Sequence, residues 1–134
     1  MMDFFECALT RRSCRRFRQT AVPREDLDRM IDAGRYVPTG FNVQTLRFAI
    51  IQSPEKVAQA FACTGWLTGK PAEDERPTAY IVVCNDDETA RNDPAVHGAT
   101  VAVMMAAHAL GDASCWHGVH NSRKFADLFD FPPT

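Results

Sequence analysis

Residues 11–44 read RRSCRRFRQTAVPREDLDRMIDAGRYVPTGFNVQ, and they carry the two motifs that indicate the fold of this chain of 134 residues. The first motif places five arginines within eight residues, with no acid among them: Arg11, Arg12, Arg15, Arg16 and Arg18. The second motif, residues 37–44, is a turn rich in hydroxyls and amides. Guanidinium groups match phosphate oxygens, and amides hydrogen-bond flat polar groups. Together the motifs indicate a cofactor that carries a phosphate.

The composition is that of one globular domain covering residues 1–134, with 46% hydrophobic and 24% charged residues. The net charge is -2, but without the five clustered arginines it would be -7, because 10 basic residues would face 17 acidic ones. The positive charge is therefore local, and no overall field that attracts nucleic acid is expected. A domain of this size needs help to enclose a large cofactor, which favours a homodimer.

The five cysteines are an odd number without a C-x-x-C pair, and no charged-then-apolar leader precedes the first helical pattern. These features predict a cytoplasmic chain whose cysteines are reduced and act as small buried apolar residues. The longest apolar window, residues 99–110, is too short for a bilayer, which requires about 20 residues. No membrane association is therefore expected.

Hydrophobic spacing and cap residues predict five helices: residues 3–12, 23–34, 53–64, 93–110, and a last helix that begins at Asn121 and Ser122. Strands are expected at residues 46–52 and 79–85, and shorter extended stretches at 14–17 and 113–119. The apolar run in the second strand predicts burial on both of its faces. Residues 65–78, with two glycines and two prolines, are expected to form an irregular loop.

Three further expectations concern the end and the buried faces of the two C-terminal helices. Gly111 is expected to end the long apolar helix. The last helix should turn Phe125, Leu128 and Phe129 inward. His97 and His108, eleven residues apart on the long helix, share a face and are expected at the border of the core.

With its parts in this order, the chain resembles the nitroreductase family of FMN-dependent flavoproteins. Four stretches carry the resemblance: RRSCRRF at 11–17, VPREDLDRMIDAGRYVPTGFNVQ at 22–44, AYIVVCND at 79–86 and AAHALGDASCWHG at 106–118. The resemblance implies an α+β fold with a small, mainly antiparallel sheet flanked by helices, and a homodimer with two FMN sites at its interface. It also implies hydride transfer from NAD(P)H through the flavin to an electron-poor acceptor, nitroaromatic or quinone, in ping-pong order.

The resemblance also implies which residues hold the flavin. In the family an R-R-S-x-R element binds the phosphate and ribityl chain, which carries over to Arg11, Arg12, Ser13 and Arg15. A P-S-G-x-N-x-Q turn reaches the same flavin from the other subunit, and its positions here are Pro38, Thr39, Gly40, Asn42 and Gln44. Gly111 matches a small residue that lets the backbone approach the ring. The sequence indicates no acid or base, so catalytic residues stay unassigned.

The chain departs from the family pattern in three places. Thr45 and Leu46 stand where Pro-Trp commonly follows the turn. Asp112 adds a carboxylate that would repel a reduced anionic flavin if it faced the ring. Family members also run on past residue 133 into another strand, so the chain is expected to be short at its C-terminus.

Other interpretations stay open. The Asp112 carboxylate and the short C-terminus are compatible with a flavin-binding dimer that does not turn over. The arginine cluster is compatible with binding RNA or DNA phosphates, although Phe17 is the only aromatic residue among the arginines. Cys115, His117 and His120 are residue types that bind zinc, but a short strand would point His120 away from the other two. No metal site is predicted.

Overall fold

A computed structural model of the chain describes residues 2–86, 93–118 and 122–130. Its elements follow in this order: α1 (Phe4–Thr10), α2 (Arg24–Arg35), the 3-10 turn η1 (Gly40–Asn42), β1 (Leu46–Ile51), α3 (Pro54–Cys63), the 3-10 turn η2 (Glu73–Glu75), β2 (Tyr80–Asn85), α4 (Pro94–Ala109) and α5 (Ser122–Phe129). The five expected helices and both main strands are present, which confirms the α+β class.

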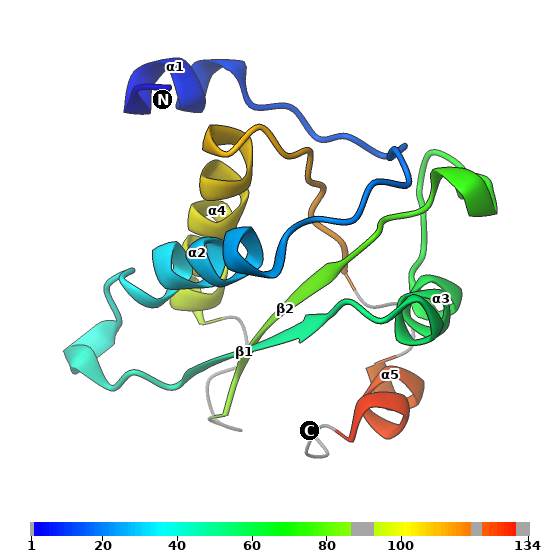
Figure 1. Cartoon of the computed structure of the whole chain (residues 1–134). Helices are drawn as coiled ribbons and strands as arrows, with labels where there is room; N and C mark the ends of the chain where they lie inside the picture. The colour runs from blue at the N-terminus through cyan, green and yellow to red at the C-terminus, as the bar shows by residue number, and fades with distance from the viewer. Residues whose placement is uncertain (1, 87–92, 119–121, 131–134) are drawn as a thin grey trace.

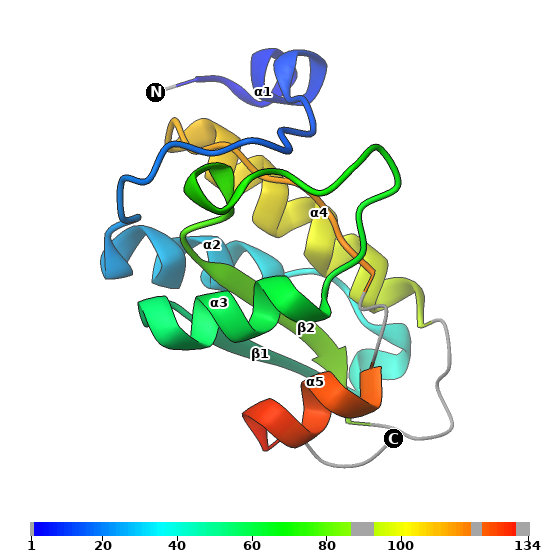
Figure 2. The same cartoon turned by 90° about the vertical axis from the view of Figure 1, so that its right-hand side faces the viewer.

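The two strands form an antiparallel sheet with helices on both faces (Figures 1 and 2). Leu46 pairs with Asn85 at one end and Ile51 with Tyr80 at the other. Because side chains alternate along a strand, each strand contributes to two cores. One core joins the sheet to α2 and α4 through Leu27, Met30, Phe48, Ile50, Ile81, Val103 and Ala107. The other joins it to α3 and α5 through Ile51, Val57, Ala60, Tyr80, Val82 and Phe125.

Gly34 marks the closest approach of α2 to the rest of the first core. A Cβ atom added to this buried glycine would lie 2.9 Å from the Phe48 ring and 3.0 Å from a methyl carbon of Val103. Real Cβ atoms essentially never approach a neighbour as closely as the first of these distances. The absence of a side chain at residue 34 therefore lets α2 lie directly against both the sheet and α4.

Short-range signals in the sequence placed several helix ends correctly. The Asp3 carboxylate accepts a hydrogen bond from the Glu6 backbone at 2.9 Å, and Asp93 accepts one from the Ala95 backbone at 2.8 Å. Gly111 has φ of 88° directly after α4, a conformation that favours glycine and stops the helix as expected. Asn121, the other expected cap, lies outside the described residues.

Four details of the structure differ from the sequence-based expectations. The residues of β2 are only half-buried, since β2 has one neighbouring strand within the described residues. Leu128 keeps 38% of its surface exposed although Phe125 is buried. The first helix ends at Thr10 rather than residue 12. The expected extended stretch near residue 114 is reduced, in its described part, to an isolated bridge between Ser13 and Ser114.

None of the helices in the described part of the chain is long and apolar enough to span a membrane.

Candidate functional site

The arginine segment runs from α1 toward α2 beside the chain that leaves α4 (Figure 1). Ser13 and Ser114 form a parallel bridge, and the backbone N–H of Cys14 donates to the Ser114 carbonyl at 2.9 Å. The bridge joins the arginine segment to the chain after α4 at Ser13 and Ser114. Two motifs about a hundred residues apart in sequence are thereby brought together.

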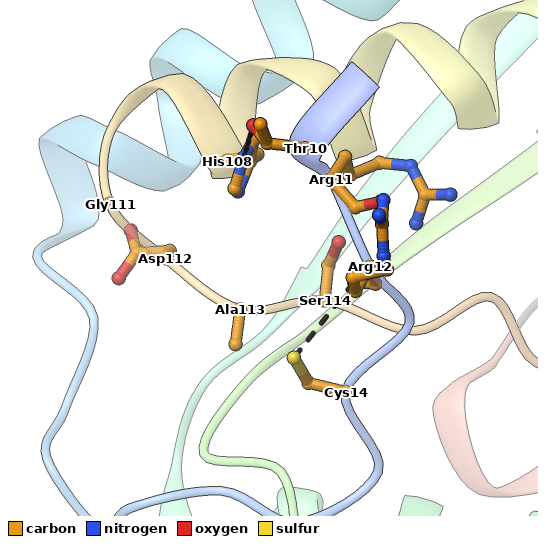
Figure 3. Close-up of a pocket in the computed structure, with 9 residues that line it drawn as sticks. All are labelled: Thr10, Arg11, Arg12, Cys14, His108, Gly111, Asp112, Ala113 and Ser114. Atoms are coloured by element: carbon orange, nitrogen blue, oxygen red, sulfur yellow. Dashed lines mark hydrogen bonds between the residues drawn. The ribbon is translucent and has the colours of Figure 1, made fainter. Parts of the chain in front are cut away.

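A cavity of about 180 Å³ lies where these two segments meet the end of α4 (Figure 3). Its lining consists of Thr10, Arg11, Arg12, Cys14, His108, Gly111, Asp112, Ala113 and Ser114. The structure therefore places Arg11, Arg12 and Gly111, three of the predicted flavin-binding residues, around one cavity. Ser13 and Arg15 do not line the cavity: both are exposed, and Ser13 takes part in the bridge.

The arginines of the cluster have different environments. Arg12 folds back on its own helix, where one guanidinium nitrogen donates to the carbonyls of Leu9 and Arg11 at 3.0 and 2.9 Å. Arg16 lies 3.6 Å from the Glu75 carboxylate. By contrast, the Nη1 atom of Arg11 is buried and has no hydrogen-bond partner in the described part of the chain. A buried cationic donor without a partner is costly, and an anion in the cavity would supply that partner.

His108 is a cavity residue that the sequence indicated only as a border residue of the core. Its Nε2 atom lies 2.9 Å from the hydroxyl of Thr10, whose own hydrogen is donated to the Glu6 carbonyl at 2.6 Å. The hydroxyl therefore accepts, and His108 carries its proton on Nε2. The spacing of His108 one turn before Gly111 could have marked it as a residue at this end of α4.

Asp112 also lines the cavity, directly after the glycine that ends α4. Its backbone N–H donates to the Ala107 carbonyl at 2.9 Å, which fixes the turn. Burial raises the pKa of the Asp112 carboxyl, and the Asp26 carboxylate raises it further. Both effects disfavour the negative charge, so this carboxyl takes up a proton more readily than an ordinary aspartic acid.

The second predicted motif, the turn at residues 38–44, is held by its own hydrogen bonds. The Thr39 carbonyl accepts from the Asn42 N–H at 3.0 Å, and the Thr39 hydroxyl accepts from the Gln44 N–H at 3.2 Å. The Gln44 amide donates to the Asn42 side-chain oxygen at 3.0 Å. Phe41, Asn42 and Gln44 all have positive φ, between 51° and 57°, although none is glycine.

This turn does not meet the arginine cavity within one chain. In both views it lies at the far side of the molecule from α1 and the arginine segment (Figures 1 and 2). Pro38, Gly40, Asn42 and Gln44 are exposed, and Thr39 is half-buried. The two halves of the predicted flavin site are therefore separate in a single copy of the chain.

A model of the family described as "Nitroreductase family" matches residues 8–133. The chain belongs to the nitroreductase family. A relative from Methanothermobacter thermautotrophicus, provisionally named NADH dehydrogenase/NAD(P)H nitroreductase, is 29% identical over 124 residues, or 89% of this chain. Those residues make up 62% of the relative, so this nitroreductase-family chain spans less than two thirds of that protein's length.

Solved structures of nitroreductases share the fold. A nitroreductase family protein from Clostridium difficile 630 is 26% identical with a TM-score of 0.75, and the match covers 98% of this chain and 77% of that one. A provisionally named nitroreductase from Desulfovibrio desulfuricans, solved in complex with FMN, is 27% identical with a TM-score of 0.76. That match covers 94% of this nitroreductase-family chain and 73% of the other.

The zinc alternative gains no support in this nitroreductase-family chain. Among the described residues no cluster of three or more His, Cys, Asp or Glu side chains could hold a metal, and His120 lies outside them. The ring of His117 packs against Trp66 with 4.0 Å between centroids, and its Nδ1 atom lies 3.3 Å from the Gly65 carbonyl. Burial lowers the pKa of His117, as expected for a packed neutral imidazole.

Proposed function

We propose that this nitroreductase-family chain is an oxidoreductase that binds FMN, takes electrons from NAD(P)H and passes them to an electron-poor acceptor such as a nitroaromatic or a quinone. The observation that carries the proposal is the buried Nη1 atom of Arg11, which has no hydrogen-bond partner in the described part of the chain and belongs to a residue that lines the cavity. A phosphate is the anion that a guanidinium matches best. The complex of the Desulfovibrio desulfuricans relative with FMN supports the same cofactor.

The residues present fit the phosphate end of FMN. Arg11 would donate to the phosphate. Ser13 and Arg15, which the resemblance also assigns to the phosphate, are exposed on the same segment and do not line this cavity. Gly111 would allow the backbone to approach the ring.

When bound, FMN supplies the hydride chemistry, by accepting from NAD(P)H and reducing the second substrate in ping-pong order. The protein's part is to bind and orient the cofactor. His108 and Thr10 would hold the end of α4 against α1, so that the cavity walls keep their positions. We assign no acid or base, because the described cavity residues give no side chain that role.

We propose further that the working form is a homodimer whose sites are shared. Asn42 and Gln44 would reach the flavin bound by Arg11 of a second copy, because the turn at residues 38–44 lies at the far side of the molecule from the arginine segment of its own chain (Figures 1 and 2). Apolar side chains exposed on α1 and around the turn support an interface on these faces: Phe4, Phe5, Leu9, Tyr36, Phe41 and Val43.

The test of cofactor binding is direct. The purified protein should be yellow and should release FMN on denaturation. Replacing Arg11 by alanine should weaken FMN binding about 10- to 100-fold, because a charged hydrogen bond contributes roughly 1.5–3 kcal/mol. Arg18→Ala removes the same charge from the same segment at a residue that does not line this cavity, so it should leave the affinity nearly unchanged. A colourless wild-type protein that binds no added FMN would refute the proposal.

Mixing two variants tests whether the site is shared. Arg11→Ala and Asn42→Ala chains should each bind FMN poorly. After the subunits are mixed by unfolding and refolding together, about a quarter of all sites should regain wild-type affinity, because one of the two sites in each mixed dimer is intact. No recovery, in a mixture shown to contain mixed dimers, would show that Arg11 of one subunit and Asn42 of the other do not form one site.

The alternative of a flavin-binding dimer without turnover remains a second candidate, and the carboxyl of Asp112 in the cavity favours it. Bound FMN that NAD(P)H fails to reduce would identify it.

The cytoplasmic location also stays a proposal. It rests on the five free cysteines and is tested by fractionation of the source cells.

A further inference from the structure

Cys14 and Cys115 occupy equivalent positions beside the bridge that joins the arginine segment to the chain after α4. Ser13 pairs with Ser114 in a parallel bridge, and each cysteine follows its serine. The Cys14 N–H donates to the Ser114 carbonyl at 2.9 Å, so the two segments still run together at this point. Adjacent parallel strands lie about 4.8 Å apart, within the Cα separation of about 4.4–6.8 Å that a disulfide spans.

The surroundings distinguish these two thiols from Cys7 and Cys63. Cys7 and Cys63 are buried, and Cys7 donates to the Met105 carbonyl at 3.2 Å. Cys14 and Cys115 are half-buried and free, and both line one cavity of about 660 Å³. The sequence-based expectation of buried cysteines is therefore correct for two of the five residues and wrong for Cys14, Cys84 and Cys115.

The bridge between Ser13 and Ser114 places the two thiols in one electrostatic environment. Burial is the main cause that raises the pKa of Cys115, and it is opposed by the guanidinium of Arg15 and, more weakly, of Arg11. A Cys14 thiolate raises the same pKa. The two guanidinium groups offset only part of the effect of burial, so the pKa of Cys115 stays raised and this thiol ionises less readily than an ordinary cysteine.

We propose that Cys14 and Cys115 form an intramolecular disulfide when the chain meets a low-molecular-weight disulfide such as oxidised glutathione. The thiolate of one cysteine attacks the small disulfide, forms a mixed disulfide and releases one small thiolate. The thiolate of the other cysteine then attacks the protein sulfur of that bond and releases the second small thiolate. Both cysteines are oxidised, the small disulfide is reduced to two thiols, and the protein's two thiol protons go to solvent or to the released thiolates.

The bond would fix two walls of the arginine cavity to one another. One wall belongs to the segment that carries Arg11, and the other to the segment that carries Gly111 and Asp112. The oxidised chain would be closed from residue 14 to residue 115, so it should also unfold at a higher temperature than the reduced chain. The modification does not depend on whether a flavin is bound, so its test is independent of the proposed function.

The experiment treats the whole reduced chain with oxidised glutathione and measures intact mass and tryptic peptides without reductant. The mass should fall by two hydrogen atoms per chain. The tripeptide Ser13-Cys14-Arg15 should be found linked to the peptide that contains Cys115, and dithiothreitol should release it. Mixed disulfides that persist on both cysteines, a link to any other cysteine, or bonds between chains would overturn the proposal.

Matched variants sharpen the result. Cys14→Ser and Cys115→Ser should each trap a stable mixed disulfide on the remaining partner, whereas Cys84→Ser, at a third half-buried cysteine, should still close the bond. Closure in either of the first two variants would contradict the pairing. If a serine variant fails to fold, the peptide map of the wild-type protein decides alone.

Discussion

The Nε2 atom of His108 lies 2.9 Å from the hydroxyl oxygen of Thr10, and this contact joins the last turn of α4 to the last turn of α1. The two residues are separated by 98 positions in sequence. The arginine segment begins directly after Thr10, and Gly111 directly follows Leu110, the residue that caps the end of α4. The contact therefore sets the distance between the two segments that form the cavity.

A double-mutant cycle should measure this contact. Thr10→Val keeps the shape of the side chain and removes the acceptor, while His108→Ala removes the donor. Each variant should lower the free energy of unfolding, with a coupling between them of about 0.5–1.5 kcal/mol, the usual net value of one hydrogen bond. The measurement is urea denaturation of the four proteins. Additive effects would mean that the two side chains do not interact in solution.

Asp112→Asn should stabilise the protein at neutral pH. The folded-state pKa of Asp112 is raised by burial and by Asp26, so the folded state binds the proton more tightly than the unfolded state. The contribution of this group to stability is therefore fully present below about pH 4, the usual value for an unfolded aspartic acid, and is lost as pH rises through the higher folded value.

The Asp112→Asn variant has no carboxyl to titrate at this position, so its stability should not show the decline with rising pH that Asp112 causes in the wild type. Thermal unfolding midpoints between about pH 4 and pH 7 provide the comparison, because this range brackets the ordinary pKa of aspartic acid and values raised above it. Asp127→Asn, on the exposed surface of α5, serves as the control and should follow the wild-type curve. A variant at residue 112 with the wild-type slope would show that Asp112 titrates normally.

Two glycines associated with α4 should respond to alanine in opposite directions. Gly111 has φ of 88°, which an alanine adopts only with strain, so Gly111→Ala should lower stability by roughly 1 kcal/mol. Gly98 lies within α4, and a Cβ atom added there would have no neighbour within 4 Å, so Gly98→Ala should raise stability by about 1 kcal/mol. Chemical denaturation of both variants checks the pair, and equal signs would be inconsistent with the structure.

Gly34→Ala should be destabilising for a different reason. The added methyl group would meet the Phe48 ring at 2.9 Å and Val103 at 3.0 Å, and overpacking of this kind costs about 1–3 kcal/mol. Phe48→Leu, which removes the ring, should cost less in the Gly34→Ala background than in the wild type. The same cost in both backgrounds, measured by denaturation, would argue against a clash with the ring.

The helices could be predicted because their signals are local. Asp3 and Asp93 cap the helices that follow them, and Gly111 ends α4, each through contacts with residues close in sequence. The family resemblance likewise rests on four continuous stretches of sequence. Such features are visible in the sequence alone because the interacting groups are fixed by their spacing.

The different environments of the arginine side chains could not be predicted from the sequence. The motif predicts the same role for Arg11 and Arg12. In the structure, the Arg12 guanidinium donates to a carbonyl at the end of α1, whereas the Nη1 atom of Arg11 is buried without a hydrogen-bond partner in the described part of the chain. That difference depends on where α1 lies against α4. The role of His108 was missed for the same reason, since its partner is distant in sequence, and the exposure of Leu128 depends on how α5 docks.

The inward bonding of Arg12 and the pairing of Arg16 with Glu75 have a consequence for ionic strength. An anion at the cavity would therefore meet mainly the charge of Arg11 rather than that of the whole cluster. Its affinity should then fall only gently with added salt, as expected for one partly buried ion pair.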